Sequence, residues 1–415
     1  MTHRVVVTGI GLITPIGIGV TAFWRALHDR RIGVSRITRF PVDDYPSQIA
    51  AQIDDFEPAD FLGAKRLRWT DRFSQFAIAA SRLAIEDSGC TLGDENAGIY
   101  IGSALGGVAY GDEQHDVFRE KGLAGVRPLL AISVFGAAAT CNVALEFGLH
   151  GPTVANGNSC ASGAVAIGDA FRAVARGDVR IALAGGAEAP LSPLVFGAFT
   201  VIRAMSTRND DPQHASRPFD RDRDGFIMAE GAGMFVVERL DDAQARGAHI
   251  YGEIVGYGLT NDAHHMSAPV PDGRWNAEAM QRALAEANIA PDDVDLLDAH
   301  GSGTVLGDQC EALAVATVFG ARTPQLPVVA TKGQHGHALG ATGAWETAVS
   351  LLAMQHGVVP ASVNADEVTE SGLAITRDET KLVPKVVLSN SAGFGGINAA
   401  LVLQSVDGND RRTKP

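Results

Sequence analysis

Short apolar runs that alternate with alanine-rich helical stretches constrain the fold of this chain more than any other feature. Nine runs have the length and composition of buried strands, at residues 5–8, 99–102, 181–184, 234–238, 254–256, 294–297, 328–330, 386–388 and 399–403. Strands that alternate with helices are typical of α/β proteins. A chain of 415 residues, 46% hydrophobic and with 47 glycines, can bury a large core and form many tight turns. The sequence therefore predicts a large α/β protein.

Cys160 lies between a predicted turn at residues 155–158 and an alanine-rich helical stretch at residues 161–176. A thiol at a helix N-terminus is near the positive end of the helix dipole, which favours the thiolate. The backbone N–H groups there can also bind a developing oxyanion. Such a cysteine can accept an acyl group, but small cysteines are also common in cores, and Cys160 taken alone fits either interpretation.

Two histidines lie in the loops that follow predicted strands. His300 follows the run at 294–297 and His337 follows the run at 328–330, and glycines flank both. Loops at strand ends are where α/β folds place chemistry, because a rigid sheet lets them converge on one point. A lone histidine is more often structural, but two at such positions, together with Cys160, indicate a shared site.

These segments and the run Asn-Ser-Ala-Gly-Phe-Gly-Gly-Ile-Asn at 390–398 resemble the β-ketoacyl-acyl-carrier-protein synthases, and the polar stretch at 206–226 is the most specific part of the resemblance. The resemblance extends over nearly the whole chain. It is closest to the elongating enzymes of fatty-acid synthase II and to the ketosynthase subunit of type II polyketide synthases. It implies the thiolase fold, with two similar βαβ-rich halves in five α-β-α-β-α layers. The halves are expected at 1–250 and 251–403, before a polar, mobile tail at 404–415.

The family resemblance implies a decarboxylative condensation of an acyl group with a malonyl group. Cys160 would hold the acyl chain as a thioester, and His300 and His337 would stabilise the enolate. The backbone N–H groups of Cys160 and Phe394 would form the oxyanion hole. The loop around Phe394 is expected to swing aside, because its neighbours include Gly393, Gly395 and Gly396.

Further roles are carried over position by position. Lys332 and Glu346 would tune the electrostatics and the position of the histidines, although either could be an ordinary salt-bridge partner. The hydroxyls of Ser302 and Thr304 would hold the phosphopantetheine arm. Ala392 stands where the family has the first phenylalanine of the gating loop, which predicts an unusual acyl pocket.

The formal net charge of -14 argues against a nucleic-acid partner and would repel an acidic carrier protein at long range. Docking of acyl carrier protein therefore needs a local basic patch. Lys65, Arg66 and Arg68, with Arg203 as a second contact, are the candidates, and the alternative is an ordinary solvated basic face.

The four cysteines have no CxxC spacing, so neither a metal site nor a disulfide framework is expected. No bound cofactor is expected, since the substrates would be carried on the phosphopantetheine of acyl carrier protein. The chain has no uncharged run that could span a membrane and begins almost at once with a strand, which predicts a cytoplasmic protein with no membrane partner.

Alternative functions differ in the residues they require. A chain-length factor shares the fold but lacks the nucleophile, and thiolases have a second cysteine near the C-terminus, whereas the last cysteine here is Cys310. A histidine at 337 rather than an asparagine indicates elongation rather than priming. Small residues at 136–139 and Ala392 suggest a roomy acyl tunnel that runs toward a dimer interface. They favour a type II polyketide ketosynthase slightly over a fatty-acid condensing enzyme, in a homodimer or in a heterodimer with a chain-length factor.

Overall fold

The computed structural model describes residues 3–92, 96–370 and 372–406. All nine predicted runs overlap strands: β1 (Val5–Thr14), β5 (Gly98–Gly102), β7 (Ile181–Glu188), β8 (Gly231–Arg239), β9 (Gly252–Asn261), β10 (Leu296–Asp298), β11 (Pro327–Val329), β15 (Val386–Gly393) and β16 (Ile397–Gln404). Each is almost completely buried.

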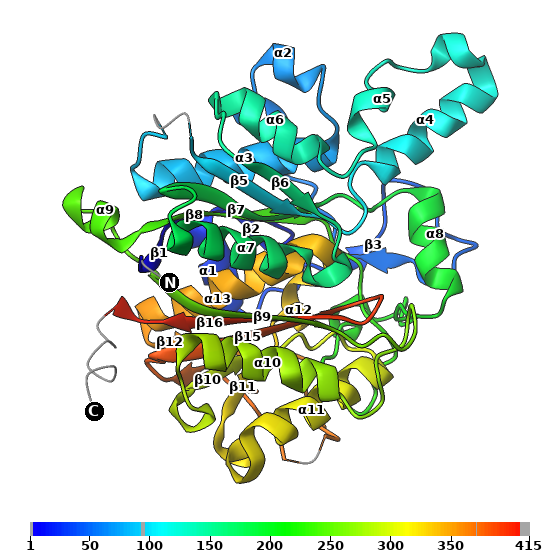
Figure 1. Cartoon of the computed structure of the whole chain (residues 1–415). Coiled ribbons are helices and arrows are strands. Elements are labelled where there is room, and N and C mark those ends of the chain that lie inside the picture. The colour runs from blue at the N-terminus through cyan, green and yellow to red at the C-terminus, as the bar shows by residue number, and fades with distance from the viewer. Residues whose placement is uncertain (1–2, 93–95, 371, 407–415) are drawn as a thin grey trace.

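Helices cover both faces of each half of the sheet and give the five layers expected (Figure 1). The outer helices are α3 (Arg72–Ser88) and α6 (Ala138–Phe147) on one side, and α10 (Arg274–Ala287) and α11 (Val305–Phe319) on the other. The central layer holds α7 (Ser162–Arg176) and α13 (Thr342–His356), which contact each other and the strands on either side. α13 is buried all round from Thr342 to Met354, as a helix between two sheets must be.

The two halves repeat one strand order. The order β6-β5-β7-β8-β1 matches β11-β10-β15-β16-β9, where β6 is Thr153–Asn156, and the parallel and antiparallel pairs also match. The halves join where the start of β1 pairs with β9. In each half the first strand carries a Gly-x-Gly that lies against a helix. A Cβ at Gly11 would lie 1.9 Å from the carbonyl oxygen of Ala80 in α3, and one at Gly258 would lie 1.9 Å from that of Ala279 in α10.

Two local predictions differ from the structure. The predicted turn at 155–158 starts inside β6, a half-exposed edge strand parallel to β5 that lacks the apolar run of a central strand. The helix after it starts at Ser162, after a 3₁₀ turn at Ser159–Ala161. Gln404, the first residue of the predicted tail, ends β16, and residues 407–415 of that tail lie outside the described residues.

The remaining elements connect and cover this framework: β2 (Gly17–Ile18), α1 (Val20–His28), β3 (Ser35–Arg36), β4 (Ile49–Ala50), α2 (Ala64–Leu67), α4 (Val108–Lys121), α5 (Leu130–Ser133), α8 (Pro193–Val201), α9 (Leu240–Ala245), α12 (Lys332–His335), β12 (Val358–Val359), β13 (Ala374–Ile375) and β14 (Thr380–Lys381). No helix within the described ranges has both the length and the hydropathy needed to cross a bilayer.

Candidate active site

One cavity of about 370 Å³ collects most of the predicted site residues from segments far apart in the sequence. The predicted residues that line it are Cys160, Arg203, His300, Ser302, Thr304, His337, Ala392, Gly393, Phe394 and Gly395. Lys332 and Glu346 lie behind this wall, each only 1% exposed. The segment at 136–139, predicted to widen an acyl tunnel, does not line this cavity.

Matching turns in the two halves bring Cys160 close to His337. Cys160 lies in the 3₁₀ turn Ser159–Ala161 before α7, and the turn Leu339–Ala341 holds the same place before α13. The first residue of each turn has a left-handed backbone, with φ 52° at Ser159 and 44° at Leu339. A Cβ at Gly163, in the first turn of α7, would lie 2.8 Å from the carbonyl oxygen of Gly340, so α7 packs too closely on the Leu339–Ala341 turn for a larger residue.

His300 and His337 lie edge to face in the cavity, with ring centroids 5.2 Å apart and an interplanar angle of 84°. Burial, together with the positive charge of Lys332, lowers the pKa of both imidazoles well below its usual value. Both rings are therefore neutral at physiological pH, and each carries one N–H.

Hydrogen bonds at the Nδ1 atoms leave both Nε2 atoms free for the cavity. The Lys332 Nζ lies 3.5 Å from His300 Nδ1, and it also donates to the His300 carbonyl oxygen and to the Glu346 carboxylate. The Thr342 hydroxyl lies 3.0 Å from His337 Nδ1. If both groups donate to Nδ1, each histidine carries its proton on Nε2.

The Cys160 thiol does not have the lowered pKa that its place before a helix suggested. Burial raises its pKa to about 11, and nearby Lys332 offsets only part of this effect. Desolvation therefore outweighs the helix dipole, which favours the thiolate, and the thiol is protonated at physiological pH.

The glycine-rich loop at 393–396 closes over Cys160. A Cβ at Gly393 would lie 3.0 Å from the Cys160 backbone nitrogen, and the Phe394 N–H donates to the thiol sulfur. The Phe394 ring stacks on Phe199, with centroids 6.2 Å apart. Gly395 has φ 81° and donates its N–H to the Met266 carbonyl oxygen at 2.7 Å. In this arrangement the Phe394 N–H is already occupied by the Cys160 sulfur.

Two buried carboxylates of α11 hold the loop after His300. Glu311 accepts from the His300 and Gly301 N–H groups at 2.7 and 2.8 Å, and Asp308 accepts from Gly303 N–H at 3.1 Å and from the Ser302 hydroxyl at 3.2 Å. The sequence interpretation missed both. Both could have been recognised in the sequence as acidic residues on the buried face of an otherwise mostly apolar helix.

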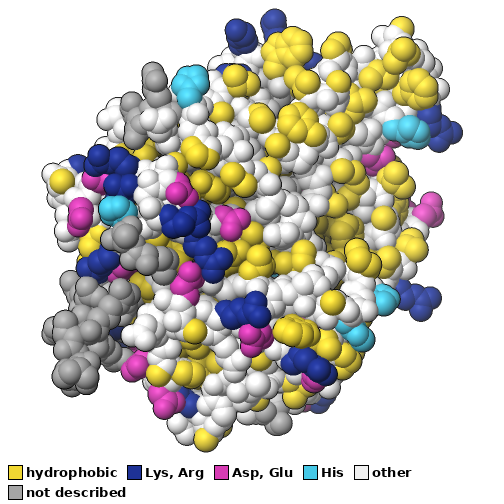
Figure 2. All heavy atoms as spheres, viewed as in Figure 1, with side chains coloured by type: hydrophobic (Ala, Val, Ile, Leu, Met, Phe, Trp, Pro, Cys, Tyr) yellow, Lys and Arg dark blue, Asp and Glu magenta, His cyan; other side chains and the backbone are white. Residues whose placement is uncertain are grey.

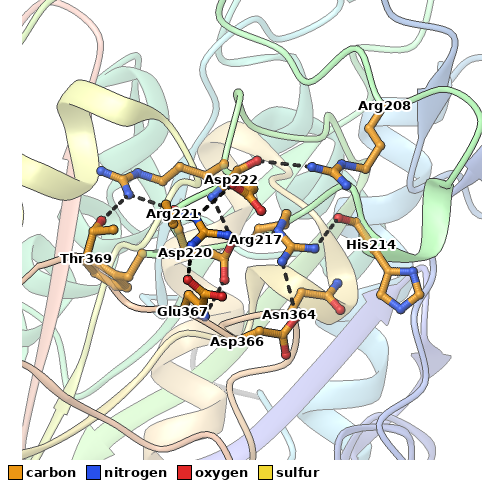
Figure 3. Close-up of polar contacts among 12 residues, drawn as sticks. Arg208, His214, Arg217, Asp220, Arg221, Asp222, Asn364, Asp366, Glu367 and Thr369 are labelled. Atoms are coloured by element: carbon orange, nitrogen blue, oxygen red, sulfur yellow. Dashed lines mark hydrogen bonds and ion pairs between the residues drawn. The ribbon is translucent and has the colours of Figure 1, made fainter.

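The polar stretch at 206–226 reaches the cavity at its end, where Asp224, Gly225 and Phe226 line it. Figure 3 shows the polar contacts that the rest of the stretch makes. Arg217 bridges Asp220 at 2.9 Å and Asp366 at 3.2 Å, which joins this stretch to the second half of the chain. Gly225 N–H donates to the Gly303 carbonyl oxygen at 3.1 Å. The stretch therefore holds the loop after His300 together with α11, since Phe219 N–H donates to Asp308 at 2.7 Å.

The predicted docking residues differ in whether their charged groups are exposed to solvent or paired within the fold. Lys65 and Arg68 are exposed on and just after α2, whereas Arg66 pairs with Glu146 at 3.0 Å and donates to the Leu145 carbonyl oxygen. The Arg66 charge is therefore used within the fold, in an ion pair with the mostly buried Glu146. Arg203 is exposed at the cavity mouth.

His335 does not line the cavity; its ring lies 2.9 Å from the Thr331 hydroxyl and contacts the face of Trp345. Within the described residues, no cluster of three or more His, Cys, Asp or Glu side chains is arranged to hold a metal ion.

Comparisons with known proteins agree with this geometry. The model of the β-ketoacyl synthase N-terminal domain matches residues 2–243, and that of the C-terminal domain matches residues 251–366. The chain is 40% identical to 3-oxoacyl-[acyl-carrier-protein] synthase 2 of Coxiella burnetii over 97% of this chain and 99% of that protein. It is also similar to the ishigamide ketosynthase/chain length factor structure, with a TM-score of 0.92, 32% identity and coverage of 98% of this chain and 100% of that one.

Another similar structure is a type II polyketide synthase acyl-carrier protein in complex with its ketosynthase, with a TM-score of 0.90, 30% identity and coverage of 98% and 100%. These likenesses confirm the predicted fold class. Two family models that together span most of the sequence, and a relative at 40% identity over nearly its full length, settle the family. The chain belongs to the β-ketoacyl synthase family.

Proposed function

We propose that the protein is an elongating synthase that condenses an acyl group held on Cys160 with a malonyl group held on acyl carrier protein. The observation that carries the proposal is that Cys160, His300 and His337 line one cavity. Purified protein incubated with malonyl-carrier and a series of acyl-carriers, alone and with a homologous partner subunit, tests it. Formation of a β-ketoacyl-carrier two carbons longer supports the proposal, and no product with any partner contradicts it.

The first step transfers the acyl chain to Cys160. The sulfur attacks the thioester carbonyl, a new C–S bond forms, and the bond to the phosphopantetheine sulfur breaks. The thiol proton passes to the leaving pantetheine thiolate, which agrees with a Cys160 thiol that is protonated at rest. The backbone N–H groups of Cys160 and Phe394 receive the oxyanion once the loop at 393–396 has shifted.

The second step forms the carbon–carbon bond. Loss of carbon dioxide leaves its electron pair in an enolate, whose oxygen accepts from the Nε2–H groups of His300 and His337. The enolate carbon attacks the thioester on Cys160, and the sulfur leaves as a thiolate that takes a proton from water. The hydroxide that remains combines with the released carbon dioxide as bicarbonate. Lys332 favours this arrangement because it holds the His300 backbone and is held in turn by Glu346.

The phosphopantetheine arm is proposed to pass the hydroxyls of Ser302 and Thr304, which lie 2.8 Å apart on the cavity wall. The Thr304 hydroxyl also accepts from Gly307 N–H at 3.2 Å and so caps α11. Its remaining hydrogen-bonding capacity is available to an amide of the arm. We also propose a division into halves at 1–250 and 251–403, supported by the repeated strand order, and a cytoplasmic location.

Replacing Lys65 and Arg68 together by glutamate is expected to raise the Michaelis constant for carrier-bound substrates, on the order of tenfold, and to spare short pantetheine analogues. Both side chains are exposed, so the change acts on the partner rather than on the fold. Added salt is expected to weaken carrier binding by the wild type in the same way. Steady-state kinetics with carrier and analogue measure both effects.

The double variant Lys381→Glu and Lys385→Glu is the matched control, since it changes the net charge equally at exposed positions in the other half of the chain. Arg66 is left intact because its ion pair with Glu146 belongs to the fold. Equal losses with carrier and analogue, or equal losses in both double variants, would contradict docking at α2.

A dimer is part of the proposed function. Hydrophobic side chains gather on the face that carries α4, α5 and α8 (Figure 2). Exposed members are Phe118, Leu123, Ile132, Val134, Phe135, Leu194 and Val201. The neighbouring β6 is an edge strand, whose unpaired backbone groups can bind another chain. We propose that a second copy or a chain-length-factor homologue covers this face.

Ala392→Phe is expected to remove activity selectively with the longest or most unsaturated acyl chains, by about tenfold or more, since it adds a large ring to the cavity wall. The result follows from the proposal that the space at Ala392 accepts bulky chains such as polyketides. Ala138→Phe is the comparison, because Ala138 is buried in α6 and does not line the cavity. It should lower activity at every length through overpacking. Uniform loss, or none, in Ala392→Phe would favour an ordinary fatty-acid substrate.

A further inference from the structure

Glu188 is a buried carboxylate that the mechanism above does not use. It is the last residue of β7 and is fully buried. Within the described part of the chain, no lysine, arginine or histidine lies within ion-pair distance of it. A buried carboxylate without a cation has to be stabilised entirely by hydrogen bonds. Burying such a carboxylate costs folding free energy, so we look for the groups that Glu188 holds in position.

Four donors from two distant segments converge on this carboxylate. One oxygen accepts from the Ser103 hydroxyl at 2.9 Å and from Leu105 N–H at 3.2 Å. The other accepts from Ala104 N–H at 2.7 Å and from Gly340 N–H at 3.0 Å. Ser103 in turn accepts from Gly106 N–H at 2.8 Å, so the arrangement continues into the next turn.

Both segments support the site. Gly340 follows Leu339 and lies three residues after His337, in the turn that packs against the Cys160 turn. Ala104 and Leu105 pack against the hydrophobic cluster that contains Cys160 and Leu339. A Cβ at Gly340 would lie 2.6 Å from the Ala104 nitrogen and 2.7 Å from the Glu188 carboxylate, so no larger residue fits between the two segments.

We propose that Glu188 is a positioning residue that clamps the turn after His337 onto the loop at 103–105 beneath Cys160 and places a negative charge next to the nucleophile. The inference rests on the proposed role of Cys160. The carboxylate geometry supports it, because only an ionised carboxylate offers enough lone pairs for four donors. Its charge also contributes to the raised pKa of the Cys160 thiol.

Glu188→Gln keeps the shape but replaces one acceptor oxygen by an amide group that faces a donor. At least one backbone N–H then has no acceptor, and the turn loosens. We expect the rate of acyl loading of Cys160 to fall on the order of tenfold, with the Michaelis constant for carrier nearly unchanged, since Glu188 contacts no substrate. Glu238→Gln is the matched control, because Glu238 is also buried. It lies in β8 opposite Ile181, at the other end of β7 from Glu188.

A second readout separates the charge from the packing. Iodoacetamide labelling of Cys160, followed by mass spectrometry of its peptide, reports the thiol without any substrate. The groups that face this thiol are Lys332 from α12, Glu188 from β7 and the two cavity histidines. Burial raises the pKa of Glu188 to about 7, so wild type and variant differ in charge only above that pH.

The ratio of labelling rates, variant over wild type, is therefore expected to stay near one at low pH and to rise above about pH 7. A ratio that does not change with pH, or normal loading by Glu188→Gln, overturns the proposal. If Glu188→Gln does not fold, Ser103→Ala removes one donor and keeps the charge, and unchanged loading in that variant also overturns the clamp. Acyl loading of a Cys160→Ala variant would instead refute the proposed function, and the labelling result is independent of it.

Discussion

Cys160→Ala is expected to abolish acyl loading and condensation while the protein stays folded. The variant removes only a sulfur atom from a buried site among small and hydrophobic residues, at a cost of about 1 kcal/mol in the free energy of unfolding. It leaves no thiol in the cavity, because Cys90, Cys141 and Cys310 do not line it. Intact-protein mass spectrometry after incubation with acyl-carrier measures the loading, and thermal unfolding checks the fold.

Cys310→Ala is the matched control, since Cys310 has the same exposed fraction as Cys160, 7%, but lies outside the cavity. It is expected to load one acyl group as the wild type does. The Cys160→Ala variant should still decarboxylate malonyl-carrier, because His300 and His337 remain. One acyl group on the Cys160→Ala protein would show that another residue is the nucleophile.

The sequence alone predicted the framework of the site, because its signals are local. Nine strands carry an apolar run in the sequence. His300 and His337 lie in the loops after two of these runs, so their convergence at the sheet edge follows from the α/β pattern. The left-handed turn before Cys160 and the duplication of the halves were less visible. The Gly-x-Gly segments at 9–11 and 256–258 are repeated in the two halves. Their equivalence is recognised only from the structure, where Gly11 packs against α3 and Gly258 packs against α10.

Other parts of the site depend on contacts between segments that no local pattern reveals. Glu188, Asp308 and Glu311 act through backbone N–H groups of distant loops, so their partners become known only in the folded chain. The state of the Cys160 thiol depends on a balance between burial and the charges of Lys332 and Glu188. The sequence does not distinguish Arg66 from its exposed neighbours Lys65 and Arg68, because the ion pair between Arg66 and Glu146 forms only in the folded chain.

His300→Ala and His337→Ala are each expected to lower condensation by a factor on the order of 10² or more, the usual effect of losing one donor to a developing oxyanion. Both imidazoles are neutral, since burial and Lys332 lower their pKa. In the proposed mechanism each offers an Nε2–H to the same enolate oxygen. Their effects should therefore not add in the double variant. The release of carbon dioxide from malonyl-carrier measures the enolate step directly.

His335→Asn is the control for these two variants. His335 is as buried as His337 and lies two residues before it, but it packs on Trp345 behind the cavity. Its replacement should lower the temperature of unfolding more than it lowers decarboxylation per folded molecule. Loading of Cys160, measured separately, is expected to continue in all three variants because the nucleophile remains. Normal decarboxylation by either His300→Ala or His337→Ala would show that the replaced histidine does not stabilise the enolate. Its N–H would then have to donate to another oxygen, such as the oxyanion formed when the thioester on Cys160 is attacked.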